Sequence, residues 1–189
     1  MTAQPPRVEI RSSPVRIAIH GVEIMSAPRM GTIYEALGKP SRLHVPTPAP
    51  PPGHRNNQIH VYDALGIRVN EHHFTFRAHE LGLTFDCKDS PFAFTPREPF
   101  RGSFVIDGKA MPLGGPEADF VRACPLPLKH TLSGLWHWED NGLYVGLQAR
   151  GSKLRSGRRS RQRQVIDFSL SWPHDPWDTS ALPSGLRSP

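Results

Sequence analysis

The side chains of this sequence that could carry chemistry are chiefly histidines, and their spacing fits no established catalytic or metal-binding pattern. His72 and His73 are adjacent, so on a strand they would point to opposite faces and would not share a metal ion. The segment 137–139 has the His-x-Glu spacing of zinc deaminases, but the Pro-Cys-x-x-Cys that completes such a site does not follow. The nucleophile elbow of serine hydrolases, the phosphate-binding loop and the dinucleotide fingerprint are missing as well.

This pattern predicts a protein without catalytic residues, metal ligands or a cofactor. The enzymatic alternative that stays open is a histidine-dependent hydrolase or nuclease, which would have to bring distant histidines together. The residues concerned are His60, His130 and His137, and the strand pairing that would decide whether they meet does not follow from the sequence.

The two cysteines, Cys87 and Cys124, are the only thiols of the chain. Cys87 ends an expected strand, and Cys124 lies on the apolar face of an expected helix. We therefore expect two buried free thiols, because free cysteine packs as a small apolar residue. A disulfide or a reactive site are the alternatives.

The basic residues are concentrated in one short segment. Seven of the 23 lysines and arginines lie between Val145 and Val165, and the remaining 16 nearly balance the 17 acidic residues. Interleaved glycines and serines predict that residues 150–163 form the tip of a hairpin that projects from two long strands. The candidate binding residues of this tip are Arg150, Lys153, Arg155, Arg158, Arg159, Arg161 and Arg163.

Three roles are open for this cationic tip. It could bind an acidic protein surface by Coulomb attraction, contact the phosphates of a nucleic acid, or serve solubility alone. The segment holds no aromatic residue on which a base could stack, and this disfavours single-stranded nucleic acid. We expect a protein partner with an acidic surface, with nucleic acid as the alternative.

A second unusual segment, 44–57, is rich in proline. Such a run favours the extended polyproline II conformation, which loses little entropy when it docks on an aromatic groove. Pro50, Pro51 and Pro52 are therefore further candidate binding residues. A stiff loop without a binding role is the alternative.

The elements that position these segments read as one unit written twice. Ile17 and Ile19 alternate before a His-Gly turn, as Phe104 and Ile106 alternate before an Asp-Gly turn, and Gly favours such turns because it accepts positive φ. In each unit a helix, an aromatic-ended strand, an acidic turn and two further strands are expected to follow. We therefore predict a tandem repeat.

The first of the two expected helices is the better defined. Met30, Ile33, Tyr34 and Leu37 follow the i, i+3, i+4, i+7 pattern, which places all four on one apolar face. Gly38 is the expected C-terminal cap, because the following Pro40 cannot continue the helix.

These patterns predict an α+β fold made of two tandem β-rich repeats, each with a short helix packed on an antiparallel sheet. The repeats would span residues 15–98 and 99–172, between disordered tails at 1–14 and 173–189. The chain has no run of 18 apolar residues and no signal peptide, so we expect a cytoplasmic protein without a membrane contact. The oligomeric state is left open.

Two segments carry a family resemblance. Leu-Gly-Lys-Pro-Ser-Arg at 37–42 and Tyr-Asp-Ala-Leu-Gly-Ile at 62–67 resemble the Leu-Gly-x-Pro-x-Arg and Tyr-Asp-x-Leu-Gly-Ile segments of an uncharacterised bacterial protein family. More distantly, the helix that ends in Leu-Gly-x-Pro is similar to the superfamily of β-lactamase inhibitory protein and the SmpA/OmlA lipoproteins.

The superfamily resemblance implies short helices on antiparallel sheets, often in tandem, in proteins that act by binding other proteins. It implies no catalytic residues. The resulting prediction is a non-enzymatic protein-binding module, of the immunity or inhibitor type that occludes a partner. A nucleic-acid-binding protein that uses residues 150–163 is the alternative.

Overall fold

The structure is a computed structural model. It describes residues 5–24, 28–46, 57–73, 75–88, 90, 92–131, 135–140, 143–153 and 159–172, with the backbone alone at 151–153 and 159–162.

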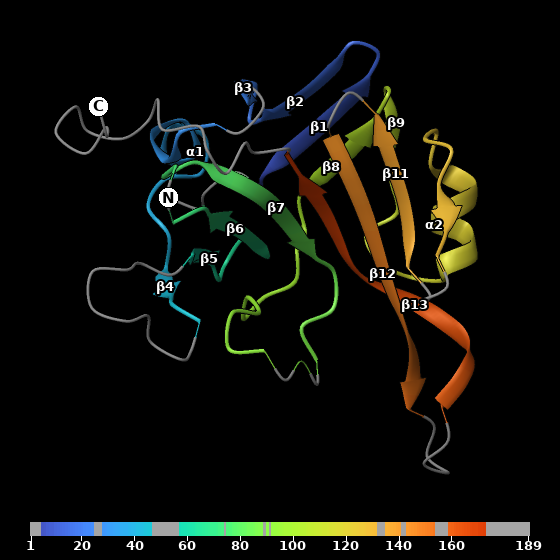
Figure 1. The fold of residues 1–189 in the computed structure, drawn as a ribbon. Coiled ribbons are helices and arrows are strands. Elements are labelled where there is room, and N and C mark those ends of the chain that lie inside the picture. Colours follow the sequence, from blue (N-terminus) through green and yellow to red (C-terminus); the bar gives the residue numbers. More distant parts are fainter. Residues whose placement is uncertain are drawn as a thin grey trace, which may run out of the picture.

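This part of the chain forms thirteen strands and two helices (Figure 1). Up to residue 84 the elements are β1 (Arg7–Ser12), β2 (Val15–Ile19), β3 (Val22–Ile24), α1 (Met30–Leu37), β4 (Arg42–His44), β5 (Gln58–Tyr62), β6 (Ile67–Glu71) and β7 (Ala78–Thr84). The later elements are β8 (Ser103–Ile106), β9 (Lys109–Ala110), α2 (Glu117–Ala123), β10 (Lys129–His130), β11 (Trp136–Asp140), β12 (Leu143–Lys153) and β13 (Arg159–Ser171).

The strands form two sheets, and both halves of the chain contribute to each sheet. The five-stranded sheet has the order β3-β2-β1-β8-β9, and the eight-stranded sheet has the order β10-β11-β12-β13-β7-β6-β5-β4. In the smaller sheet Val8 of β1 lies opposite Ile19 in an antiparallel pair and opposite Phe104 in a parallel pair. In the larger sheet β13 and β7 join the two halves in an antiparallel pair with Ser169 opposite Gly82.

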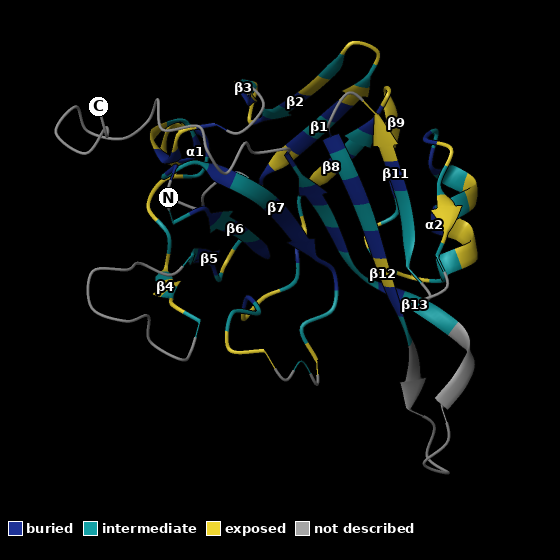
Figure 2. Ribbon diagram, in the orientation of Figure 1, coloured by how far each residue is buried: buried dark blue, intermediate teal, exposed yellow. Residues whose placement is uncertain are grey.

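The core draws side chains from both sheets and both helices. Alternate residues of a strand point to the same face, and the buried positions of β1, β2 and β8 follow this period. The rings of Phe104 and Phe168 come together from the two sheets with centroids 4.7 Å apart, and Phe120 of α2 lies 6.0 Å from Phe168. Dark blue segments in the interior of Figure 2 mark these buried positions.

The predicted fold class, α+β with two tandem repeats that each pack a short helix on an antiparallel sheet, is wrong. The fold is mostly β, with two helices of eight and seven residues in the described part of the chain. The repeats also do not form separate sheets, because β1 pairs with β8 and β7 pairs with β13. The apolar patterns gave the strands but not their partners, since pairing over long sequence separations depends on tertiary packing.

The N-terminal tail predicted for residues 1–14 is also partly wrong. Residues Arg7–Ser12 form β1, which lies in the middle of the five-stranded sheet between β2 and β8. Its Val8 and Ile10 are fully buried, so this strand belongs to the core. The Pro- and charge-rich composition concealed it, because the charged residues alternate with the buried ones and face outward.

Helix α1 ends at the predicted Gly38 cap but buries a different face. Gly38 ends it with a positive φ of 76°, and its N–H donates to the Tyr34 carbonyl. The buried residues are Met30, Ile33 and Ala36, whereas Tyr34 is 38% exposed. The expected inward position of Tyr34 is therefore wrong, and its ring lies at the surface.

The order of elements recurs along the chain. The series β2, β3, α1, β4, β5, β6, β7 is followed by β8, β9, α2, β10, β11, β12, β13, so each series has two strands, a helix and four strands. The two series lie on opposite sides of the β7–β13 pair in the eight-stranded sheet. Superposition of the two halves as a true repeat stays a prediction.

Candidate interaction edge of the eight-stranded sheet

The eight-stranded sheet ends in two edges of different character. At one end β10 presents Lys129 and His130, both exposed. At the other end Leu43 of β4 is 54% exposed, and Val45, directly after the strand, is 44% exposed. Charged residues protect an edge strand from pairing with another chain, whereas exposed apolar residues favour such contact. The edge at β4 is therefore the one suited to an interaction.

An aromatic pair lies beside the opposite face of this edge, because it packs at His44, whose side chain points away from the face of Leu43. The rings of Phe92 and Phe94 stack with centroids 5.1 Å apart and planes 14° from parallel. Phe94 lies 5.7 Å from the ring of His44, which places the pair beside the edge strand. Phe92 is 56% exposed. We call the apolar rim the set of side chains that flank this edge, with Leu43 and Val45 on one face and Phe92 and Phe94 beside the other.

An ion pair fixes the aromatic part of the rim to the sheet. Arg42 donates from Nε and Nη2 to the Asp63 carboxylate at 3.0 and 3.1 Å, and from Nη2 to the Thr95 carbonyl at 2.8 Å. The Arg97 N–H donates to the same carboxylate at 3.0 Å. Partial burial would raise the pKa of Asp63, but the hydrogen bonds and charges of Arg42 and Arg97 together lower it below 3.8. The rim is thus held in a defined shape.

A buried hydrogen-bonded chain lies next to the rim. His60 of β5 is directly opposite Leu43 and only 2% exposed. Its Nε2 lies 2.7 Å from Glu71 Oε2, and its Nδ1 lies 3.2 Å from the Tyr34 hydroxyl. An ionised carboxylate can only accept hydrogen bonds. Opposite such a carboxylate, Nε2 is the donor and Glu71 the acceptor. In the neutral imidazole Nδ1 then accepts from the Tyr34 O–H.

Other histidines gather near this chain, contrary to the expectation from the sequence. The rings of His72 and His73 lie 4.8 Å apart rather than on opposite faces, and His72 and His79 lie 6.0 Å apart. The reason is a register shift at Asn70/Glu71, after which β6 ends and the two residues enter a turn. Among the described residues no group of three or more His, Cys, Asp or Glu side chains is arranged to hold a metal ion.

Of the histidines that an enzyme would have to gather, His60 stays apart from the other two, whereas His130 and His137 lie on neighbouring strands one register position apart. His60 is in β5, His130 in β10 and His137 in β11, and four strands separate β5 from β11 in the sheet order. His137 instead stacks on Tyr144 of the neighbouring strand, with ring centroids 5.8 Å apart.

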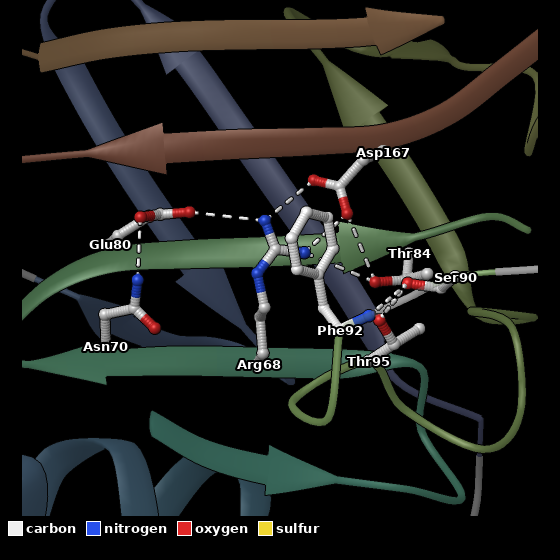
Figure 3. A network of polar contacts seen from close by, with 8 residues as sticks. All are labelled: Arg68, Asn70, Glu80, Thr84, Ser90, Phe92, Thr95 and Asp167. Carbon is white, nitrogen blue, oxygen red and sulfur yellow. Dashed lines mark hydrogen bonds and ion pairs between the residues drawn. The ribbon is translucent and has the colours of Figure 1, made fainter. Parts of the chain in front are cut away.

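A second polar network lies in the middle of the sheet and joins its two halves (Figure 3). Arg68 of β6 makes two hydrogen bonds to the Asp167 carboxylate on β13 and a third, at 3.3 Å, to Glu80 of β7. Thr84 donates to Asp167 at 3.2 Å, and Asn70 donates to Glu80 at 2.8 Å. The network therefore links three strands.

Gly82 makes room for this network. A Cβ at Gly82 would lie 2.5 Å from Arg68 Cζ, so the arginine can cross β7 only because this residue lacks a side chain. Burial favours the neutral form of Asp167 and raises its pKa, despite the opposing charge of Arg68. Burial would lower the pKa of Arg68, but its two carboxylate partners outweigh burial and raise it. These groups serve to clamp the sheet.

Two of the predicted cationic binding residues, Arg150 and Arg163, are held by contacts within the fold. Arg150 donates to the Lys88 carbonyl at 2.7 Å and lies 4.0 Å from Asp86. Arg163 donates to the Ala149 carbonyl at 2.8 Å and pairs with Glu117 at 3.4 Å. Both side chains anchor the base of the β12–β13 hairpin instead of extending from it.

The remaining predicted site residues are only partly described. Lys153, Arg159 and Arg161 lie in β12 and β13, so the predicted tip at 150–163 includes strand residues, but their side chains are not described. The other predicted binding residues, Arg155, Arg158, Pro50, Pro51 and Pro52, lie outside the described residues. The described residues thus do not bring the predicted binding side chains together.

Both cysteines are free thiols. Burial, followed by the nearby charge of Asp86, raises the pKa of Cys87 to about 11, and burial also raises the pKa of Cys124. A raised pKa keeps each sulfur protonated at neutral pH, and a protonated thiol is a poor nucleophile. The predicted free thiols are therefore confirmed, but of the predicted burial only that of Cys124 is, because Cys87 is half-buried.

The sequence did not predict the apolar rim or the hydrogen-bonded group of Tyr34, His60 and Glu71 beside it. The alternating pattern of 42–45 was hidden next to the prolines, and Phe92 and Phe94 lie in a segment to which no role was given. Their spacing, two aromatics separated by Ala93, was the available signal. Tyr34, His60 and Glu71 are too far apart in sequence to suggest a group. The Leu43–His60 register brings them together.

A family model described as "Domain of unknown function (DUF7738)" matches residues 9–118. The matched range includes the apolar rim, the Tyr34–His60–Glu71 chain and part of the central network. The predicted resemblance to an uncharacterised family is confirmed at this level, whereas the two motif segments and the superfamily relation stay predictions. No curated protein and no solved structure matches the chain. In the described residues no helix has the length and apolar character needed to cross a bilayer.

Proposed function

Because this chain belongs to the DUF7738 family, whose description assigns no activity, we propose a function from the geometry of its sheet edge: it is a protein-binding module that docks a partner on the apolar rim. The partner presents an extended apolar segment that lies along β4 and covers Leu43, Val45 and Phe92. As an immunity or inhibitor-type protein, the module would occlude the surface of the partner from which this segment comes.

The difference between the two edges of the eight-stranded sheet carries this proposal. Both edges have unpaired backbone groups, and β10 offsets this with Lys129 and His130. In β4, Arg42 and His44 are only partly exposed, held by Asp63 and by the Phe94 ring, and the exposed residues are Leu43 and the following Val45. An edge strand that offers backbone hydrogen bonds beside apolar contacts is the arrangement used when a protein binds an added strand.

Charge at the rim supports a partner with an acidic surface. The side chain of Arg97 is largely exposed and lies beside the rim, since it approaches Asp63 at 3.8 Å. Lys39, between α1 and β4, is also exposed. Cations around an apolar contact speed association with an acidic surface and disfavour a basic one.

The nucleic-acid alternative depends on the cationic hairpin. Arg150 and Arg163 are held by Asp86 and Glu117, and this lowers the charge that they offer to phosphates. The other five predicted residues would have to supply the affinity, which would fall steeply as salt is raised. We therefore place protein binding first.

Site-specific photocrosslinking in the native host tests the proposal. A benzophenone amino acid is placed at Leu43 on the apolar edge and, as the matched control, at His130 on the charged edge of the same sheet. We expect one discrete crosslinked protein from position 43 and none from position 130, with the product lost when Phe92 is changed to Glu. Equal patterns from both positions, or a product that survives Phe92→Glu, would contradict docking at the rim.

A gel-shift experiment addresses the alternative. Full-length protein is titrated against duplex DNA and RNA at low and physiological salt, beside a variant with Arg159 and Arg161 changed to Ser. Binding that persists at physiological salt and is lost in the variant would favour the nucleic-acid function over the rim.

A further inference from the structure

Beside the rim, three side chains are arranged as a nucleophile, a base and a group that orients the base. The Tyr34 hydroxyl lies 3.2 Å from His60 Nδ1, and His60 Nε2 lies 2.7 Å from Glu71 Oε2. In the tautomer with the proton on Nε2, His60 donates to Glu71 and Nδ1 can accept from the Tyr34 O–H. A hydroxyl is activated in this way when an imidazole removes its proton and a carboxylate holds the imidazole in the correct tautomer. From this geometry we propose that Tyr34 is a nucleophilic tyrosine that accepts an acyl group from an activated acyl donor.

The environment fits each role. His60 and Glu71 are buried, with side-chain exposures of 2% and 8%, so their geometry is fixed and water competes little for their hydrogen bonds. Tyr34, on α1, is 38% exposed as a whole residue, and its hydroxyl contacts the buried His60. The proposal requires an acyl donor to reach the phenol oxygen from the exposed side of the ring while the proton leaves toward the interior.

The two other tyrosines lack this arrangement. The Tyr62 hydroxyl faces the Gly38 carbonyl at 3.4 Å, and burial followed by the proximity of Tyr34 strongly raises its pKa. The Tyr144 ring stacks on His137 with centroids 5.8 Å apart. Tyr144 is therefore an internal control, because it too has an imidazole neighbour but stacks on that ring.

The reaction balances without an oxidant or a metal. The Tyr34 oxygen attacks the carbonyl carbon of a thioester or another activated acyl compound, and the phenol proton moves to His60 Nδ1. The imidazolium that forms is stabilised by Glu71, which is a positioning residue. When the tetrahedral intermediate collapses, the bond to the leaving group breaks and the proton passes to that group. The products are an O-acyl Tyr34 and a free thiol or alcohol.

Acetylation by N-acetylimidazole tests this inference on the full chain. Modification of the tyrosines is followed by peptide mass spectrometry across pH 6 to 10. We expect Tyr34 to react about ten-fold or more faster than Tyr144 at neutral pH, a modest effect beside the roughly 10²–10⁴-fold that a positioned general base contributes. The Tyr34 rate should level off well below the phenol pKa of about 10, because the imidazole and not the free phenolate controls it.

Variants separate the roles. His60→Gln should reduce the Tyr34 rate about ten-fold, whereas the matched change His137→Gln should leave it unchanged. Glu71→Gln should lower the rate and shift its pH profile, which loss of packing alone would not do. Because His60 is buried, folding of each variant is checked by circular dichroism, and the wild-type pH profile decides the matter if His60→Gln does not fold.

Equal rates at Tyr34 and Tyr144, or a Tyr34 rate that rises only above pH 9, would overturn the inference. The assay needs no binding partner. Its failure would leave docking at the rim intact, and failure of the rim experiment would leave the reactivity of Tyr34 intact.

Discussion

Removing Arg68 should destabilise the protein strongly, because this residue neutralises charges that the sheet has taken out of water. In Arg68→Met the apolar stem is kept, but the Asp167 side chain, 13% exposed, loses its bidentate partner and Glu80 loses its cation. Leaving one member of a buried ion pair without its partner costs about 3–5 kcal/mol. Since small proteins have about 5–15 kcal/mol in total, much of the stability should be lost.

The double variant Arg68→Met with Asp167→Leu separates two effects: the cost of leaving Asp167 buried without its partner, and the net stability that the ion pair itself contributes. Replacement of a whole buried pair by apolar residues is often close to neutral. Urea unfolding at pH 7 should therefore show the double variant recovering at least half of the loss seen in the single variant. A single variant that loses less than about 1 kcal/mol, or a double variant less stable than the single one, would refute the reasoning.

The pH dependence gives a second readout. Burial raises the folded-state pKa of Asp167 above the ordinary 3.8, so the folded state binds this proton more tightly than the unfolded state. The free energy of unfolding then falls as pH rises from the unfolded pKa through the folded one. Without Arg68 the folded pKa should rise further, so the gap between Arg68→Met and wild type should narrow as pH falls from 7 toward 4.

Three further outcomes are expected. Asp63→Asn should lower the free energy of unfolding in urea by about 1–3 kcal/mol at pH 7. Because the folded-state pKa of Asp63 is lowered, the stability that its carboxylate contributes is lost as pH falls through that pKa. The difference between Asp63→Asn and wild type should therefore close at acid pH. Iodoacetamide should modify Cys87 slowly at pH 7.5 and much faster near its pKa of about 11. Rapid labelling at neutral pH, followed by mass spectrometry, would contradict the raised pKa. Gly66→Ala should lower the thermal unfolding midpoint much more than Gly21→Ala. Both positions have positive φ, where a side chain costs about 1–2 kcal/mol. Only at Gly66 would the new Cβ also lie 2.0 Å from the Phe100 backbone nitrogen.

Local features of the fold were predictable where the signal lay within a few residues. The period of Met30 and Ile33 with Gly38 located α1, and the turn dipeptides at 20–21 and 107–108 located two hairpins, each with positive φ at both turn residues. The free thiols of Cys87 and Cys124 followed from their apolar surroundings.

Features that depend on distant partners were not predictable. The parallel pairing of β1 with β8 joins residues nearly a hundred positions apart, and it turned an expected tail into a central strand. The rim escaped notice because exposure of Leu43 depends on β4 being the last strand of the sheet. The same pattern in a central strand would be core.

The sequence alone determined which residues alternate, where the chain turns, and that its excess positive charge lies between Val145 and Val165. Tertiary structure decided which strands lie at the sheet edges and that Arg68 pairs with Asp167 across β7. It also placed Tyr34, His60 and Glu71 in one series of hydrogen bonds. The physical reason is that side-chain period and turn chemistry are encoded by neighbours in sequence. Strand order and the burial of charge are set by contacts between segments that only the folded chain brings together.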